Sequence, residues 1–253
     1  MTAPIVTWAR MIKLSHTIFA MPFALAAAVL AARDVDVTAI QIGGIVLAMV
    51  FARSSAMGFN RVIDRDIDAK NPRTVTRELP AGEISVRAAW GFTIASAALF
   101  VAVCAVLGPA TLALSPVAIA IVWGYSLTKR FTALCHLVLG VALALAPTGV
   151  WIALTGGYGP IPAALSLAVA TWVAGFDIVY ACQDAAFDHE QGLYSVPSVL
   201  GIRGALAVSL GLHFVTVAVL AALPALTPLG WAPRSRPSWP TSTGSCRRPT
   251  CRG

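Results

Sequence analysis

The chain has 253 residues, of which 58% are hydrophobic and only 11% are charged. A soluble domain carries about 25% charged residues, so this balance excludes an ordinary soluble protein and indicates an integral membrane protein. The net charge is +7, but residues 232–253 contribute five arginines and no acid, and subtracting them leaves +2 for residues 1–231. The basic balance therefore gives no reason to expect a nucleic-acid partner, and we predict none.

Seven apolar segments follow one another along the chain, and most are close to the ~20 residues that cross a bilayer as a helix. They lie near residues 14–32, 40–59, 88–108, 111–127, 134–155, 163–181 and 205–229. The first is longer than a signal-peptide core, and no small-residue cleavage site follows Pro22, so we expect it to be retained. The predicted fold is all-α, a polytopic transmembrane helical bundle.

Basic residues between these segments fall mostly on one side of the predicted bundle. Arg33 is almost alone on the opposite side, whereas the first side carries Arg10, Lys13, Arg61, Arg65, Lys70, Arg73, Arg77, Arg87, Lys129, Arg130 and Arg203. Because basic loops stay in the cytoplasm, we expect the amino terminus and these loops to face it, in a cell membrane of the bacterial type.

The end of the chain differs in composition from the rest. We assign residues 1–231 to a transmembrane domain, whereas residues 232–253 are rich in Arg, Pro, Ser and Thr and form neither a span nor a packed core. We expect this tail to be disordered or the product of a frameshift. A tail that binds anionic lipids is the alternative.

Two acidic repeats each follow an apolar segment. The first is Asn60-Arg-Val-Ile-Asp64-Arg-Asp-Ile-Asp68, and the second is Tyr180-Ala-Cys-Gln-Asp184-Ala-Ala-Phe-Asp188. In each, the spacing i, i+4, i+8 places three polar groups on one face of a helix. Four carboxylates at one membrane surface repel each other unless cations neutralise them. A solvated acidic loop, or ion pairs of Asp64 and Asp68 with neighbouring arginines, is the alternative.

Mg²⁺ is the cation that these side chains favour. Aspartate oxygens without histidine or thiolate partners suit Mg²⁺, which completes its shell with water and substrate phosphates. The five cysteines show neither zinc spacing nor a disulfide framework. A magnesium-bound diphosphate would resolve the repulsion between the repeats.

Basic side chains on the same side could hold such a diphosphate. Lys129 and Arg130 follow Tyr125 in YSLTKR, Arg73 and Arg77 follow the first repeat, and Arg53 lies two turns before Asn60 inside a predicted span. An arginine within the membrane indicates a polar cavity. His16, at the start of the first span, is a further candidate for a substrate pocket, or an ordinary interfacial histidine.

The pair NRVIDRDID and YACQDAAFD, with YSLTKR between them, resembles the UbiA superfamily of intramembrane aromatic prenyltransferases. The likeness runs from about Lys13 to Gly204, and GFDIVYACQD with GLYSVPSVLG resembles its 4-hydroxybenzoate polyprenyltransferase-like branch. The resemblance implies nine helices around a central cavity, whereas seven spans are predicted here. It therefore suggests that the last two helices are missing.

The resemblance also implies an activity and roles for individual residues. The activity is Mg²⁺-dependent transfer of a polyprenyl group from its diphosphate to an aromatic acid. Asn60, Asp64 and Asp68 would hold one Mg²⁺, and Asp184 and Asp188 the other. Arg53, Lys129 and Arg130 would contact the diphosphate, with Arg77 as a further substrate-binding residue. Tyr125 and Tyr180 would flank the reacting allylic carbon.

Three functions remain open from the sequence. The first is prenylation of 4-hydroxybenzoate or a related acid for quinone synthesis, and the second is prenylation of a naphthoate for menaquinone synthesis. The third is a cation or solute transporter, although transporter carboxylates usually lie near the membrane midplane. A chain without catalytic activity is a further possibility.

Overall fold

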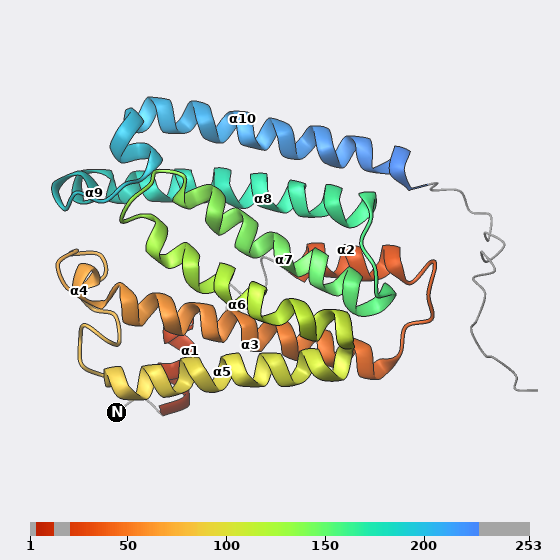
Figure 1. The fold of residues 1–253 in the computed structure, drawn as a ribbon. Helices are drawn as coiled ribbons and strands as arrows, with labels where there is room; N and C mark the ends of the chain where they lie inside the picture. The colour runs from red at the N-terminus through yellow and green to blue at the C-terminus, as the bar shows by residue number, and fades with distance from the viewer. Residues whose placement is uncertain (1–3, 13–20, 228–253) are drawn as a thin grey trace, which may run out of the picture.

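The structure is a computed structural model that describes residues 4–12 and 21–227, and within these ranges it is helical with connecting loops (Figure 1). Within the described residues, six helices are long and apolar enough to cross a membrane. Their bounds are α3 Ala39–Ile63, α5 Val86–Leu107, α6 Pro109–Thr128, α7 Cys135–Thr155, α8 Pro160–Ala181 and α10 Val196–Leu226. They correspond to six of the seven predicted spans, and the all-α prediction is confirmed.

The first predicted span corresponds in part to a shorter apolar helix, α2 Met21–Ala31, because residues 13–20 lie outside the described ranges. The helix α1, Pro4–Met11, precedes them. The predicted tail at 232–253 also lies outside the described residues and stays a prediction.

Local signals set several helix ends. The Thr38 hydroxyl accepts a hydrogen bond from the N–H of Gln41, and the Gln41 side chain accepts one from the N–H of Thr38. The helix α3 therefore begins with a capping box. Ser85 caps α5 in a similar way. At the other end of α3, the chain leaves helical geometry at the middle residue of the first acidic repeat.

The short helices α4 Arg65–Asp68 and α9 Ala185–Glu190 lie at the same end of the bundle, on the left of Figure 1. The turn η2, Cys182–Asp184, joins α9 to α8. Both acidic repeats therefore lie at one end of the molecule, as their spacing from the apolar segments predicts.

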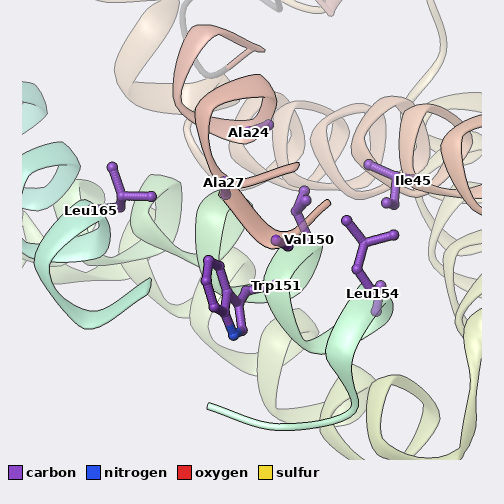
Figure 2. Close-up of a cluster of buried hydrophobic side chains, with 9 residues drawn as sticks. Ala24, Ala27, Ile45, Val150, Trp151, Leu154 and Leu165 are labelled. Atoms are coloured by element: carbon purple, nitrogen blue, oxygen red, sulfur yellow. The ribbon is translucent and has the colours of Figure 1, made fainter. Parts of the chain in front are cut away.

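A hydrophobic cluster lies toward the opposite end, where α2 packs across α7 (Figures 1 and 2). Figure 2 shows Trp151 and Leu154 of α7 beside the small side chains of α2 and beside Ile45 of α3. Since lipid is as apolar as these side chains, close packing rather than burial from water holds such helices together. This cluster lies toward the end of the bundle that is remote from the repeats.

The helix α8 packs against both α7 and α10 along much of its length. At Gly140 of α7, a Cβ would collide with the backbone of Ala170, and at Gly175 of α8 it would collide with His213 of α10. These glycines therefore allow the three helices to approach closely. Because α7, α8 and α10 pack closely, the polar side chains that they carry near the acidic end are held in fixed positions.

Candidate active site

A cavity of about 680 Å³ runs from the acidic end into the bundle. Polar groups of both repeats line it: Asn60, Asp64, Asp68, Tyr180, Asp184 and Asp188. Most of the remaining wall consists of apolar and small side chains from α3, α5, α6, α7 and α8. The cavity thus has a charged mouth and an apolar interior within one bundle.

The first repeat is not one continuous helix. Asp64 has φ −89° and ψ 3°, so it ends α3 and the short helix α4 begins after it. The N–H of Asp64 still bonds to the carbonyl of Asn60, and the N–H of Asp68 to that of Asp64. The three side chains therefore still line the same cavity, although the prediction of an unbroken helix was wrong at Asp64.

Asp64 lies among amide and cationic groups. Asn60 Nδ2 donates to its Oδ2 over 2.9 Å, Arg130 lies 3.3 Å from Oδ1, and Lys129 Nζ lies 4.0 Å from Oδ2. Burial raises the pKa of Asp64 above its usual value, and the charge of Asp68 adds to this, while Lys129 and Arg130 act in the opposite direction. Its ionised form would therefore gain from a further cation.

Asp68, the last residue of the repeat, is buried against arginines. Nη1 of Arg77 lies 2.7 Å from each carboxylate oxygen, and the buried Arg61 lies 3.9 Å away. Arg61 also donates to the carbonyl of Met11, which fixes α1 beside the repeat. Arg77 lines the cavity, so one cation contacts both an aspartate of the repeat and the open space.

The second repeat has the same break at its middle aspartate. Asp184 has φ −105° and ψ 4°, and it separates the end of η2 from α9. Its carboxylate accepts bonds from Asn71 and from the guanidinium of Arg73, both in the loop that follows the first repeat. Arg73 also donates to the Tyr180 hydroxyl over 3.0 Å and lies over the Tyr180 ring. The loop that follows the first repeat is therefore bonded directly to the second repeat.

Lys129 and Arg130 differ in place, although they are neighbours in the sequence. Lys129 lines the cavity and interacts electrostatically with Asp64, Asp184 and Asp188, so it faces both repeats. Arg130 donates to the carbonyl of Ile63 over 2.7 Å and is not among the residues lining the cavity. Of these two cations, Lys129 is the one positioned to contact a ligand held between the repeats.

Arg53 and Tyr125 lie deeper in the cavity wall. Nε of Arg53 is buried, and no atom of the described residues bonds to it. Tyr125 interacts electrostatically with Arg53 and Asp64. Nearby, the ring of Phe59 stacks on Trp123 at 4.9 Å, and Trp123 donates to Ser55, which stiffens this wall. A buried guanidinium with an unused donor suits an anionic group of a ligand.

The residues at the mouth fit Mg²⁺ by their chemistry. Within the described residues, no three His, Cys, Asp or Glu side chains converge on one point. Asn60 supplies an amide oxygen to which no donor of the described part of the chain bonds. Mg²⁺ commonly takes one or two carboxylates and completes its octahedron with water and phosphate oxygens.

Most of the predicted site residues line the cavity, but some do not. The predicted residues that line it are Arg53, Asn60, Asp64, Asp68, Arg77, Tyr125, Lys129, Tyr180, Asp184 and Asp188. Arg130 contacts Asp64 but does not line the cavity. His16 lies outside the described residues. The prediction missed Asn71 as a site residue and did not place Arg73 on the second repeat. Sequence spacing carries no signal for a contact across 111 residues.

Residues 20–238 match the UbiA prenyltransferase family. This chain belongs to that family. Among relatives, it is 32% identical over 190 residues to the 4-hydroxybenzoate octaprenyltransferase of Vibrio atlanticus, covering 75% of this chain and 65% of that one. It is 34% identical over 171 residues to a polyprenyl transferase of Arthrinium sp, covering 65% and 54%. The chain thus spans between about half and two thirds of the length of these curated relatives.

Solved structures of the family have the same fold. An apo UbiA homologue from Aeropyrum pernix K1 superposes with a TM-score of 0.80 at 38% identity, covering 85% of this chain and 81% of that one. A UbiA homologue from Archaeoglobus fulgidus, bound to GPP and Mg²⁺, superposes with a TM-score of 0.73 at 25% identity, covering 87% and 78%. The resemblance predicted from the acidic repeats is confirmed.

Proposed function

We propose that this protein transfers a polyprenyl group from polyprenyl diphosphate to an aromatic acid resembling 4-hydroxybenzoate, in quinone biosynthesis and with Mg²⁺ as cofactor. The observation that carries the proposal is the shared cavity, in which the carboxylates of both repeats surround a mouth that continues into an apolar interior. Such a space suits a substrate with a diphosphate head and a long hydrocarbon tail. The names of the curated relatives and the GPP and Mg²⁺ of the Archaeoglobus homologue support it.

The residues at the mouth would bind and orient the diphosphate. Asn60, Asp64, Asp68, Asp184 and Asp188 would hold Mg²⁺, whose charge would stabilise the leaving diphosphate. Lys129 and Arg77 would add fixed positive charge on the same side. These cations lie at one end of the cavity, so they would fix the direction in which the diphosphate points.

The cavity interior would protect the reacting carbon. Ionisation of the allylic C–O bond leaves a carbocation that water would capture, so a mostly apolar wall favours attack by the aromatic ring. Tyr125 and Tyr180 would flank that carbon, and Arg53, deeper in the wall, would pair with an anionic group of a substrate. The same arrangement supports a naphthoate acceptor as the alternative.

The position of the carboxylates speaks against transport as the function. In transporters, coupling-ion sites usually lie near the midplane, whereas both repeats lie at one end of this bundle. The basic loops at that end support a cytoplasmic orientation for the mouth.

Membranes that contain the protein should test the activity directly. We expect labelled 4-hydroxybenzoate and polyprenyl diphosphate to yield a lipophilic product with Mg²⁺ and none with EDTA. Asp64→Ala and Asp184→Ala should each abolish the product, whereas Asp66→Ala, at a solvent-exposed side chain, should not. Activity retained in either of the first two variants would refute a two-site magnesium mechanism. A panel of naphthoate and benzoate acceptors would identify the ring.

A further inference from the structure

A buried histidine and an aspartate meet in the cavity wall below the acidic mouth. His136, in the first turn of α7, places Nδ1 2.7 Å from Oδ2 of Asp177 on α8. The His136 side chain is 5% exposed and that of Asp177 is 31% exposed, and both residues line the cavity. The aspartate therefore reaches the open space while the histidine supports it from behind.

The third partner of this pair fixes the histidine tautomer. The backbone N–H of Val196, at the start of α10, lies 3.2 Å from Nε2 of His136. A backbone N–H only donates, so Nε2 must accept and the histidine proton is on Nδ1. His136 therefore donates from Nδ1 to Asp177, which holds the carboxylate in one orientation.

No Lys or Arg side chain of the described residues forms an ion pair with Asp177. Asp177 interacts with His136 and, electrostatically, with Tyr125 of α6, which also interacts with Arg53. A carboxylate among transmembrane helices is costly, and such groups usually have a functional partner. Asp177 thus has His136 as a supporting donor and no lysine or arginine partner among the described residues.

The depth of Asp177 suits a phenol rather than a phosphate. Asp177 precedes Asp184 by seven residues, and a helix rises ~1.5 Å per residue, so it lies ~10 Å below the carboxylates at the mouth. When the diphosphate of prenyl diphosphate is bound at the mouth, the aromatic ring that attacks the first carbon of the prenyl chain must lie on this deeper side. A carboxylate at this depth accepts hydrogen bonds. The aromatic substrate must therefore present a hydrogen-bond donor, such as a ring hydroxyl.

We propose that Asp177 is a catalytic residue that takes the hydroxyl proton of a phenolic acceptor, and that His136 is its positioning residue. This inference rests on the proposed prenyl transfer. It specifies that the acceptor needs a free hydroxyl next to the attacked carbon, and it names the group that activates that ring.

The electrons and protons balance in two stages. In the first, the O–H proton passes to Asp177, the ring carbon beside the oxygen forms a C–C bond to the allylic carbon, and the allylic C–O electrons leave with diphosphate. In the second, the hydrogen on the attacked carbon leaves as a proton to diphosphate, and Asp177 returns its proton to the oxygen. The net result is a prenylated phenol and protonated diphosphate, with Asp177 restored.

The competing explanation is that the three groups only tie α7, α8 and α10 together. A structural role predicts lower thermal stability on substitution and no dependence on the acidity of the acceptor. His213 provides a matched control, because it bonds the Ser209 carbonyl and packs over Gly175 of α8 without lining the cavity.

Turnover is tested with Asp177→Asn and a series of 3-halogenated 4-hydroxybenzoates of increasing hydroxyl acidity. With 4-hydroxybenzoate we expect kcat to fall about 10²–10⁴-fold, the usual contribution of a general base. The ratio of the wild-type kcat to the Asp177→Asn kcat should fall steadily as the hydroxyl becomes more acidic. His136→Ala should show a smaller deficit with the same trend, His136→Asn should restore part of it, and His213→Ala should show no trend. A constant deficit across the series, or turnover within twofold of wild type, would overturn the proposal.

A binding measurement separates this proposal from the transfer activity itself. In the presence of Mg²⁺ and inorganic pyrophosphate, calorimetry should show the wild type binding 4-hydroxybenzoate more tightly than benzoate, and Asp177→Asn should lose most of that preference. Equal binding of the two acids by wild type would refute a phenol site at Asp177. If the preference is present while no acceptor is prenylated, the phenol site stands and the proposed transfer fails.

Discussion

Arg73 Nε donates a 2.9 Å hydrogen bond to Oδ1 of Asp184, so the loop after the first acidic repeat holds the middle aspartate of the second. The same guanidinium contacts the other carboxylate oxygen and the Tyr180 hydroxyl. It therefore occupies the place where a metal ion would neutralise Asp184. If Asp184 binds Mg²⁺, the ion and Arg73 must share or exchange this carboxylate.

Arg73→Ala should make the stability of the protein depend more strongly on Mg²⁺. Without the ion, the substitution leaves the partly buried carboxylate of Asp184 with the Asn71 amide but without its arginine, which costs about 1–3 kcal/mol. With the ion, the metal would neutralise Asp184 in place of the guanidinium and recover part of that loss. Thermal unfolding in detergent, with Mg²⁺ and with EDTA, measures the difference between the two states.

Arg65→Ala is the matched control for this prediction. Arg65 pairs with Asp66, whose side chain is 81% exposed, so its removal should change stability little in either condition. An Mg²⁺-induced rise in the unfolding temperature that is no larger for Arg73→Ala than for wild type would contradict the exchange.

Lys129→Met and Arg130→Met should differ in their effect on prenyl transfer. Lys129 faces carboxylates of both repeats from within the cavity, whereas Arg130 bonds a backbone carbonyl at its border. Loss of a cation that stabilises the leaving diphosphate should lower kcat/KM about 10²–10³-fold for Lys129→Met. The loss for Arg130→Met should be several times smaller. Steady-state kinetics with a fixed acceptor and varied diphosphate measure both.

Equal losses in the two variants would show that both cations reach the diphosphate in the working enzyme. Lys129→Arg supplies the control, since it retains the charge but has a larger head group. It should recover most of the binding of polyprenyl diphosphate, even if turnover stays below wild type.

The sequence predicted the bundle well because membrane helices follow a simple physical rule. About 20 apolar residues are needed to cross the bilayer, and the apolar segments therefore located the six long helices α3, α5, α6, α7, α8 and α10. The sequence also predicted that the polar groups of each repeat lie together, since residues at i, i+4 and i+8 share a face of a helix. The local break at Asp64 and Asp184 was not predicted, because the spacing of the polar residues carries no signal for it.

Contacts between distant segments were beyond prediction from spacing. The partner of Asp184 comes from position 73, and the partner of Asp177 comes from position 136, through the crossing of α7 and α8. Neither helix carries a local signal that names its partner. The sequence YSLTKR did not distinguish Lys129 from Arg130. In the structure α6 ends at Thr128, and of the two residues that follow, Lys129 lines the cavity and Arg130 does not.

The interior of the cavity should limit the length of the prenyl chain. Gly149 of α7 lines it, and a Cβ added there would meet no atom within 4 Å, so a larger side chain would extend into open space. Gly149→Leu should therefore discriminate against long prenyl diphosphates, with their conversion relative to a short one falling roughly tenfold or more. Product analysis with donors of graded length, competed in one reaction, measures the ratio.

Gly43→Leu is the matched control for this substitution. Gly43 of α3 also has no atom near an added Cβ, but it does not line the cavity. Both glycines lie inside helices, so leucine should raise helix propensity equally at the two sites, by up to about 1 kcal/mol. A shift in chain-length preference in Gly149→Leu but not in Gly43→Leu would place the tail along α7. The same shift in both variants would show that the effect comes from the helix backbone, and unchanged preference in both would place the tail elsewhere in the bundle.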